Sequence, residues 1–172
     1  FPSVSVGWNI AQEAFMEKYS FISQLKLRGS WGELGNQEIG YYPFAQYIGL
    51  GNNYVWGDNK VSGVAISSLA NPDIKWETTA TTDIGIDAAF LNNKITLTAD
   101  YFYKKTSDIL LQLPIPGIVG ISTEPYVNAA SVKNEGWEFA LGYNDQWGDW
   151  KFGANVNFSK VKNEILDLHG KD

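Results

Sequence analysis

The sequence has 172 residues, of which 15% are aromatic and 17 are glycine, with no cysteine and a formal net charge of −6. The missing cysteines exclude disulfides, cysteine metal sites and thiol catalysis within these residues. The negative charge disfavours a nucleic-acid partner, because phosphate binding requires a basic patch. The longest apolar run, around residues 117–121, is too short and too interrupted by proline and glycine for a transmembrane helix, so only strands could enter a membrane.

Six stretches alternate between apolar and small or polar residues, which is the period of a β-strand with one apolar face. In chain order the predicted strands are Ser3–Ile10, Leu25–Trp31, Thr82–Phe90, Lys94–Lys104, Glu135–Asn144 and Trp150–Ser159. They are roughly 7–11 residues long, near the ~9–11 residues of a tilted transmembrane strand. The fold class predicted is therefore all-β.

The positions of the aromatic residues and the loop lengths distinguish a membrane barrel from a soluble sandwich. Most of the strand aromatics fall near predicted strand ends, as interfacial girdles do; they are Trp8, Trp31, Trp76, Phe90, Tyr101, Tyr103, Trp137, Tyr143, Trp150 and Phe158. Tight turns are predicted at 91–94 and 145–149, and Ala11–Ser20 lies on the same side, whereas the connections 33–76 and 106–133 are long. Short turns on one side and long loops on the other predict an antiparallel transmembrane β-barrel.

About six strands cannot close a barrel, since single-chain barrels begin at eight strands and an open edge in lipid leaves backbone groups unpaired. We therefore expect residues 1–172 to be part of one larger barrel domain.

Five blocks of the sequence form an ordered pattern: FPSVSVGWNIAQEAFM (1–16), LKLRGSWGELGNQEIGYYPF (25–44), NPDIKWETTATTDIGIDAAFLNNKITLTADYFYKKTSDILLQLPIP (71–116), NEGWEFALGY (134–143) and FSKVKNEIL (158–166). In this order they resemble the SusC/RagA type of TonB-dependent outer-membrane transporter. Phe102 stands where the family usually has tyrosine, a mild departure, and the resemblance runs from Phe1 to about Leu168.

This resemblance implies a transporter in the outer membrane of a Gram-negative, Bacteroidetes-type bacterium. Such a protein imports glycans or peptides with a SusD-like surface lipoprotein, and TonB transmits the energy through an N-terminal plug and TonB box. Neither the plug nor the TonB box is recognisable in this chain, so it is not expected to transport alone. It is not expected to be an enzyme, and no cofactor is expected.

The carboxylates and one arginine on the polar faces are expected to point into a hydrated lumen: Arg28, Asp83, Asp87, Asp100 and Glu138. Lys26, Lys94, Lys104 and Lys151 are expected to balance them. Paired carboxylates are also found in glycoside hydrolases, which keeps a hydrolase fragment as an alternative. The single histidine, His169, lies in a polar tail and is expected to be solvated, and Gly57–Asn59 is expected to be a plain turn; no metal site is predicted.

The first long loop carries the candidate contacts with a ligand or with the lipoprotein. The candidates are Tyr41, Tyr42, Tyr47, Tyr54 and Trp56. Their rings offer apolar area with a polar handle, which suits stacking on sugars or gripping a partner, although loops packing on one another would also explain them. A soluble β-sandwich that binds glycans through this loop is the alternative function.

Overall fold

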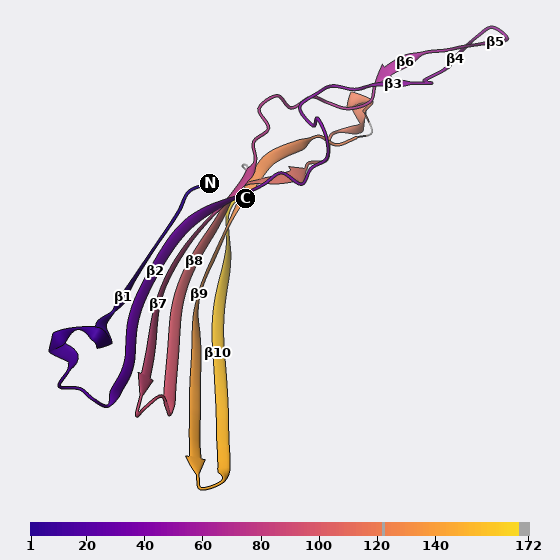
Figure 1. Ribbon diagram of the computed structural model, residues 1–172. Helices are drawn as coiled ribbons and strands as arrows, with labels where there is room; N and C mark the ends of the chain where they lie inside the picture. Colours follow the sequence, from indigo (N-terminus) through magenta and orange to yellow (C-terminus); the bar gives the residue numbers. More distant parts are fainter. Residues whose placement is uncertain (122, 169–172) are drawn as a thin grey trace. The chain divides into compact units, whose positions relative to one another are not determined.

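A computed structural model describes residues 1–121 and 123–168, so His169 lies outside the described residues. These residues form six main strands: β1 (Ser3–Asn9), β2 (Ile22–Asn36), β7 (Glu77–Phe90), β8 (Ile95–Gln112), β9 (Tyr126–Trp147) and β10 (Trp150–Asp167). They make one antiparallel sheet in the order β1-β2-β7-β8-β9-β10, so each strand pairs with its predecessor among them (Figure 1). None of the helices in the described part is long and apolar enough to cross a membrane.

The chain divides into two units, which we describe separately. The first consists of Phe1–Leu34, Thr79–Thr106 and Val132–Leu166, and contains most of the six-stranded sheet. The second consists mainly of Gly35–Thr78 and Ser107–Ser131.

The pairing of β1 with β2 confirms that the sheet has one apolar and one polar face. Val4 lies opposite Trp31 and Trp8 opposite Leu27, whereas Ser5 lies opposite Ser30 and Gly7 opposite Arg28. Because side chains alternate along a strand, this register places like residues together on each face. The predicted alternation is therefore the alternation observed.

The apolar face continues across β8, β9 and β10 as a row of neighbouring rings. Tyr101 and Trp137 have ring centroids 4.9 Å apart, Trp137 and Phe139 are stacked at 6.1 Å, and Phe139 lies 6.4 Å from Phe158. Nearer the β9–β10 turn, Tyr143 and Phe152 are 6.2 Å apart. The pairs that cross between strands stabilise the sheet through side chains on a single face, and Trp137 with Phe139 continues the row along β9.

Three short connections lie at one end of these strands (Figure 1). Residues 91–94 join β7 to β8 and residues 148–149 join β9 to β10, both as tight turns. Residues 10–21 join β1 to β2 and contain the 3-10 turns η1 (Ile10–Gln12) and η2 (Ala14–Met16). This connection is held to the neighbouring turn, because Leu91 donates a backbone hydrogen bond to the Phe21 carbonyl at 2.8 Å. The predicted short-turn side is confirmed.

The six-stranded sheet has no apolar core of its own. Within the described residues, the buried hydrophobic side chains are four alanines: Ala88, Ala89, Ala129 and Ala130. Large apolar side chains on the apolar face are open instead, with Ile84 59% exposed, Val156 65% and Phe158 60%. A globular domain buries such residues, so this face requires an apolar environment from outside the chain.

The strand lengths differ from the prediction. β9 has 22 residues and β10 has 18, so both continue well beyond the alternating apolar stretch. Tyr101, Trp137 and Phe158 consequently lie inside strands and not at their ends, and the predicted loop 106–133 contracts to residues 113–125. Backbone pairing continues wherever a neighbouring strand is available, whether or not the side chains are apolar, which is why alternation alone set the bounds too short.

The second unit contains four short strands that the sequence did not predict. β3 (Ile48–Leu50) pairs with β6 (Val64–Ile66), and β4 (Tyr54–Trp56) pairs with β5 (Asn59–Val61). Gly57 and Asp58 form the tight turn between β4 and β5, with Gly57 at φ +60°, so a turn is present where one was predicted. Strands of three residues are too short to show a period in the sequence.

Asn128 joins three segments of the second unit. Its amide nitrogen donates to the carbonyls of Lys75 (2.9 Å) and Asp108 (2.7 Å), and its amide oxygen accepts from the Lys75 backbone nitrogen at 2.9 Å. The 3-10 turn η3 (Gly117–Val119) lies between β8 and β9 in this unit.

The backbone conformation of the β7–β8 turn predicts which substitutions the full-length protein tolerates there. Leu91, Asn92 and Asn93 all have positive φ, with Asn93 at 64°. A branched side chain is strained there by about 1–2 kcal/mol, whereas glycine is not. Asn93→Val should lower the temperature at which the folded form is lost on semi-native electrophoresis, and Asn93→Gly should not. Equal effects of the two changes would contradict this geometry.

Candidate functional site

The polar face of the first unit is organised around one arginine. Arg28 on β2 donates from Nε to Asp87 Oδ2 (3.0 Å) and from Nη2 to Asp100 Oδ2 (2.9 Å), and Nη1 lies 3.5 Å from Asp83 Oδ1. Thr98 adds a hydrogen bond to Asp87 Oδ1 at 3.2 Å. A single guanidinium thus links carboxylates on β7 and β8, using the fixed fork geometry that lysine lacks. We call these four charged residues the Arg28 cluster.

A glycine on the intervening strand makes room for this contact. Gly85 lies between Asp83 and Asp87 on β7, and a Cβ atom placed on it would overlap Asp100 Oδ1 and approach Arg28 Cζ to 2.7 Å. The Arg28 side chain can cross β7 and reach β8 because this position has no side chain. Asp100 Oδ1, which lies 2.7 Å from Arg28 Nη2, is enclosed in the same place.

The Arg28 cluster retains an excess of negative charge. Three carboxylates face one guanidinium, and the four side chains are 15–33% exposed. Such partly solvated ion pairs contribute modestly to stability, because water screens them. Their clearer effect is to keep fixed negative charge on this face of the sheet.

The predicted site residues are only partly brought together. Arg28, Asp83, Asp87 and Asp100 meet as described, whereas Glu138 makes no hydrogen bond or ion pair within the described part and lines a shallow hollow with Thr98, Asp100 and Asn157. The expected balance from several lysines is wrong for Lys94. It lies in the β7–β8 turn and pairs with Asp145 at 2.7 Å, and this hydrogen bond raises the pKa of Lys94 above its ordinary value.

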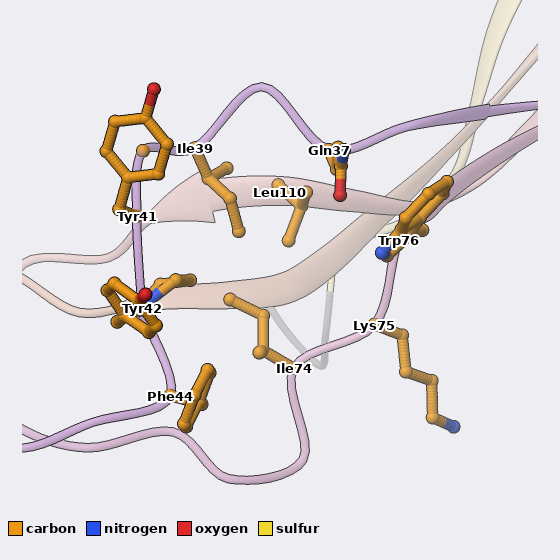
Figure 2. A pocket seen from close by; sticks show the side chains of 11 residues that line it. Gln37, Ile39, Tyr41, Tyr42, Phe44, Ile74, Lys75, Trp76 and Leu110 are labelled. Carbon is orange, nitrogen blue, oxygen red and sulfur yellow. The ribbon is translucent and has the colours of Figure 1, made fainter.

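The second unit contains an aromatic pocket of about 460 Å³. Figure 2 shows Tyr42 and Phe44 at one end and Trp76 at the other, with three aliphatic side chains between them: Ile39, Ile74 and Leu110. The Tyr41 ring and the Lys75 ammonium point away from this apolar centre. A mostly apolar hollow with a few polar groups at its rim is the usual form of a ligand or partner pocket.

The five predicted loop aromatics divide into three groups. Tyr41 and Tyr42 line the pocket. Tyr47 supports them, since its hydroxyl lies 3.2 Å from the Tyr41 carbonyl and 3.3 Å from the Tyr42 carbonyl. Tyr54 and Trp56 lie instead on the β4–β5 ribbon, 6.4 Å apart in an edge arrangement, with Trp56 76% exposed.

Nine lining residues of the pocket lie outside the predicted set, and they come from three stretches of sequence: residues 37–44, residues 74–76 and Leu110. Trp76 was expected near a strand end as part of an aromatic girdle, and it also stands in the resembling block 71–116, but neither observation predicted a pocket. Ile74 and Leu110 had no local signal, because their convergence depends on the fold.

An open antiparallel sheet with one exposed apolar face, one charged face and short turns at one end is the architecture of a transmembrane β-barrel wall. Residues 1–171 match the family described as TonB dependent receptor-like, beta-barrel. The chain therefore belongs to the TonB-dependent receptor β-barrel family.

Similar proteins agree with this assignment. The chain is 35% identical to the TonB-dependent receptor P26 of Formosa agariphila and 33% identical to the TonB-dependent receptor SusC of Bacteroides thetaiotaomicron, each over 100% of this chain. It spans only 17% and 18% of those relatives, respectively. Among solved structures, the RagAB peptide importer in its closed-closed state superposes with a TM-score of 0.82 at 32% identity, covering 96% of this chain and 18% of that one.

The space above Gly85 predicts a selective effect of one methyl group. Gly85→Ala should displace Asp100 and Arg28 and lower the thermal stability of the full-length protein, since overpacking costs about 1–3 kcal/mol. Gly29→Ala is the matched control, because a Cβ there meets only ordinary contacts at 3.9 Å. Thermal unfolding followed by loss of the compact electrophoretic band would measure both. Equal stability of the two variants would contradict the proposed crossing of Arg28 over β7.

Proposed function

We propose that this chain forms part of the barrel wall of a SusC/RagA-type TonB-dependent transporter in the outer membrane of a Gram-negative bacterium. The complete protein would import glycans or peptides together with a SusD-like lipoprotein. Residues 1–172 would belong to the barrel alone, with the plug and the TonB box supplied by other parts of the protein. The observation that carries this proposal is the exposed apolar face of the six-stranded sheet.

The height of this face fits a bilayer. On β10 the apolar positions run from Trp150 to Phe158, a stretch of nine residues, and ~9–11 residues of a tilted strand cross a bilayer. Aromatic pairs lie toward both ends of the band, Tyr143 with Phe152 near the turns and Tyr101 with Trp137 farther away. A lipid-facing band about 25 Å tall between aromatic girdles is expected of outer-membrane barrels.

The opposite face would line the lumen. Side chains on the two faces of a strand alternate, so an apolar face against lipid places the Arg28 cluster and Glu138 toward the interior. The fixed charges of the Arg28 cluster and Glu138 would keep the interior of the barrel hydrated. This role works through shape and polarity and requires neither catalytic residues nor a cofactor.

The long connections would lie on the extracellular side, opposite the short periplasmic turns. There the aromatic pocket and the exposed rings of Tyr54 and Trp56 would meet the lipoprotein or the substrate. Aromatic rings of this kind supply much of the binding energy where a partner covers them.

The alternative functions have less support. A sandwich requires a second multi-stranded sheet, but the described residues form one six-stranded sheet and two ribbons of two strands. A hydrolase requires a free carboxylate pair, whereas Arg28 holds three of the four candidate carboxylates.

Neighbouring positions on β10 test the orientation of the sheet. Val156→Lys places a cation on the proposed lipid face, where the cost reaches about 2–4 kcal/mol at the bilayer midplane and falls toward the interfaces. It should sharply reduce the amount of full-length protein assembled in the outer membrane, as measured by fractionation and heat-modifiable migration. Asn157→Lys adds the same charge to the opposite face and should assemble normally. Normal assembly of both variants would contradict the proposal.

The β4–β5 ribbon tests the extracellular contact. Trp56→Ala should weaken co-purification of the native lipoprotein partner or uptake of the native substrate by several-fold, because it removes a large exposed ring. Trp147→Ala is the control, since Trp147 is 67% exposed but adjoins the short β9–β10 turn. If both variants behave like the wild type, Trp56 has no role in binding.

A further inference from the structure

The apolar face of β9 and β10 changes abruptly into a charged surface at its end away from the short turns. Along β9 the apolar series ends at Trp137, and the next two positions on the same face are Glu135 and Lys133. Along β10 the series ends at Phe158, and the following positions on that face are Lys160, Lys162 and Glu164. We call these five charged residues the rim cluster.

Ion pairs organise most of the rim cluster. Lys133 lies 3.0 Å from Glu164 and 3.5 Å from Glu135, and Lys162 lies 3.0 Å from Glu164 and 3.9 Å from Glu135. Lys160 forms no ion pair with any described residue. Three lysines thus face two glutamates, and one ammonium group is left for an anion.

A hollow of about 330 Å³ lies at the boundary between the rings and the rim cluster. It is lined by Tyr101, Glu135, Gly136, Trp137, Lys160 and Lys162. Two aromatic residues and two lysines therefore line one hollow of the first unit. Gly136 contributes no side chain to this hollow.

We propose that this hollow binds the phosphate-bearing headgroup of an outer-leaflet lipid, an inference that rests on the membrane orientation under Proposed function. That orientation places the end of the band away from the short turns at the extracellular surface. Aromatic rings belong at headgroup depth, and lysine ammonium groups bind phosphate as compact charges.

The same surroundings favour a lipid over a soluble phosphate. Trp137 is stacked on Phe139, which adjoins Phe158, so the hollow opens directly onto the apolar band. A bound headgroup would leave its acyl chains lying on these rings. A free anion would gain nothing from that surface.

The test uses the full-length protein purified in mild detergent, with phosphatidic acid as the probe and phosphatidylcholine as the neutral-headgroup reference. Native mass spectrometry would compare the wild type, Lys160→Gln/Lys162→Gln and a charge-matched control, Lys60→Gln/Lys151→Gln. Lys60 lies on β5 and Lys151 on the polar face of β10. The fraction of protein that carries bound phosphatidic acid should be at least five-fold higher for the wild type and the control than for Lys160→Gln/Lys162→Gln. Retention of phosphatidylcholine should be equal in all three.

Equal retention of phosphatidic acid by all three proteins would overturn the proposal. Displacement of the lipid by millimolar inorganic phosphate alone would also overturn it, because the hollow would then be a site for soluble anions. Heat-modifiable migration of the same samples reports whether each barrel is folded. A failure of the barrel assignment would appear there in the wild type, and can therefore be told apart from a failure of lipid binding.

Discussion

The strict separation of two faces in a single sheet is the constraint on which the rest of the structure depends. The backbone groups of the inner strands are satisfied by their neighbours, but the apolar side chains of one face are not satisfied within the chain. The buried hydrophobic residues of the described part are alanines, while Val6, Ile84 and Val156 are each more than half exposed. Water is an unfavourable surrounding for a continuous surface of this kind. Lipid on that face would provide the apolar surroundings that these side chains need. Further strands beside β1 and β10 would pair with the backbone groups at the two edges of the sheet.

The polar face follows a different physical rule, in which glycine on one strand accommodates a large side chain from another. Gly85 lies beneath the contact of Arg28 with Asp100. A Cβ on Gly136 would come within 2.8 Å of the Phe102 ring, which explains how an aromatic residue fits on this face. Gly142 leaves similar room for Thr96 and Asn155. Small residues beside large ones allow the face to carry fixed charges without distorting the ladder.

Much of this arrangement could be predicted from the sequence, because its cause is local. Alternation assigned Trp8 and Leu27 to one face and Gly7 and Arg28 to the other, and the register of β1 with β2 confirms it. The tight turn predicted at 91–94 is also observed, with positive φ at Asn92 and Asn93. The resemblance to TonB-dependent transporters is confirmed by the family match and by the similar structures.

The features that could not be predicted depend on how strands pair. The contacts of Arg28 with Asp83, Asp87 and Asp100 require the relative register of β2, β7 and β8, which a single sequence does not contain. The parts of β9 and β10 that extend past Trp137 and Phe158 lack apolar alternation, so the sequence pattern predicted loops there. The aromatic pocket collects side chains from 37 to 110, and only folding brings Leu110 near Tyr42.

The environment of the two faces is the central claim, and spin labels measure it directly. Single labels would be placed at Val156, Asn157 and Phe158 in the full-length protein reconstituted into lipid bilayers, and their collisions with oxygen and with a water-soluble nickel chelate compared. Labels at Val156 and Phe158 should collide mainly with oxygen, which partitions into lipid, and the label at Asn157 mainly with the nickel chelate. Equal access of nickel to all three positions would contradict a lipid-facing sheet.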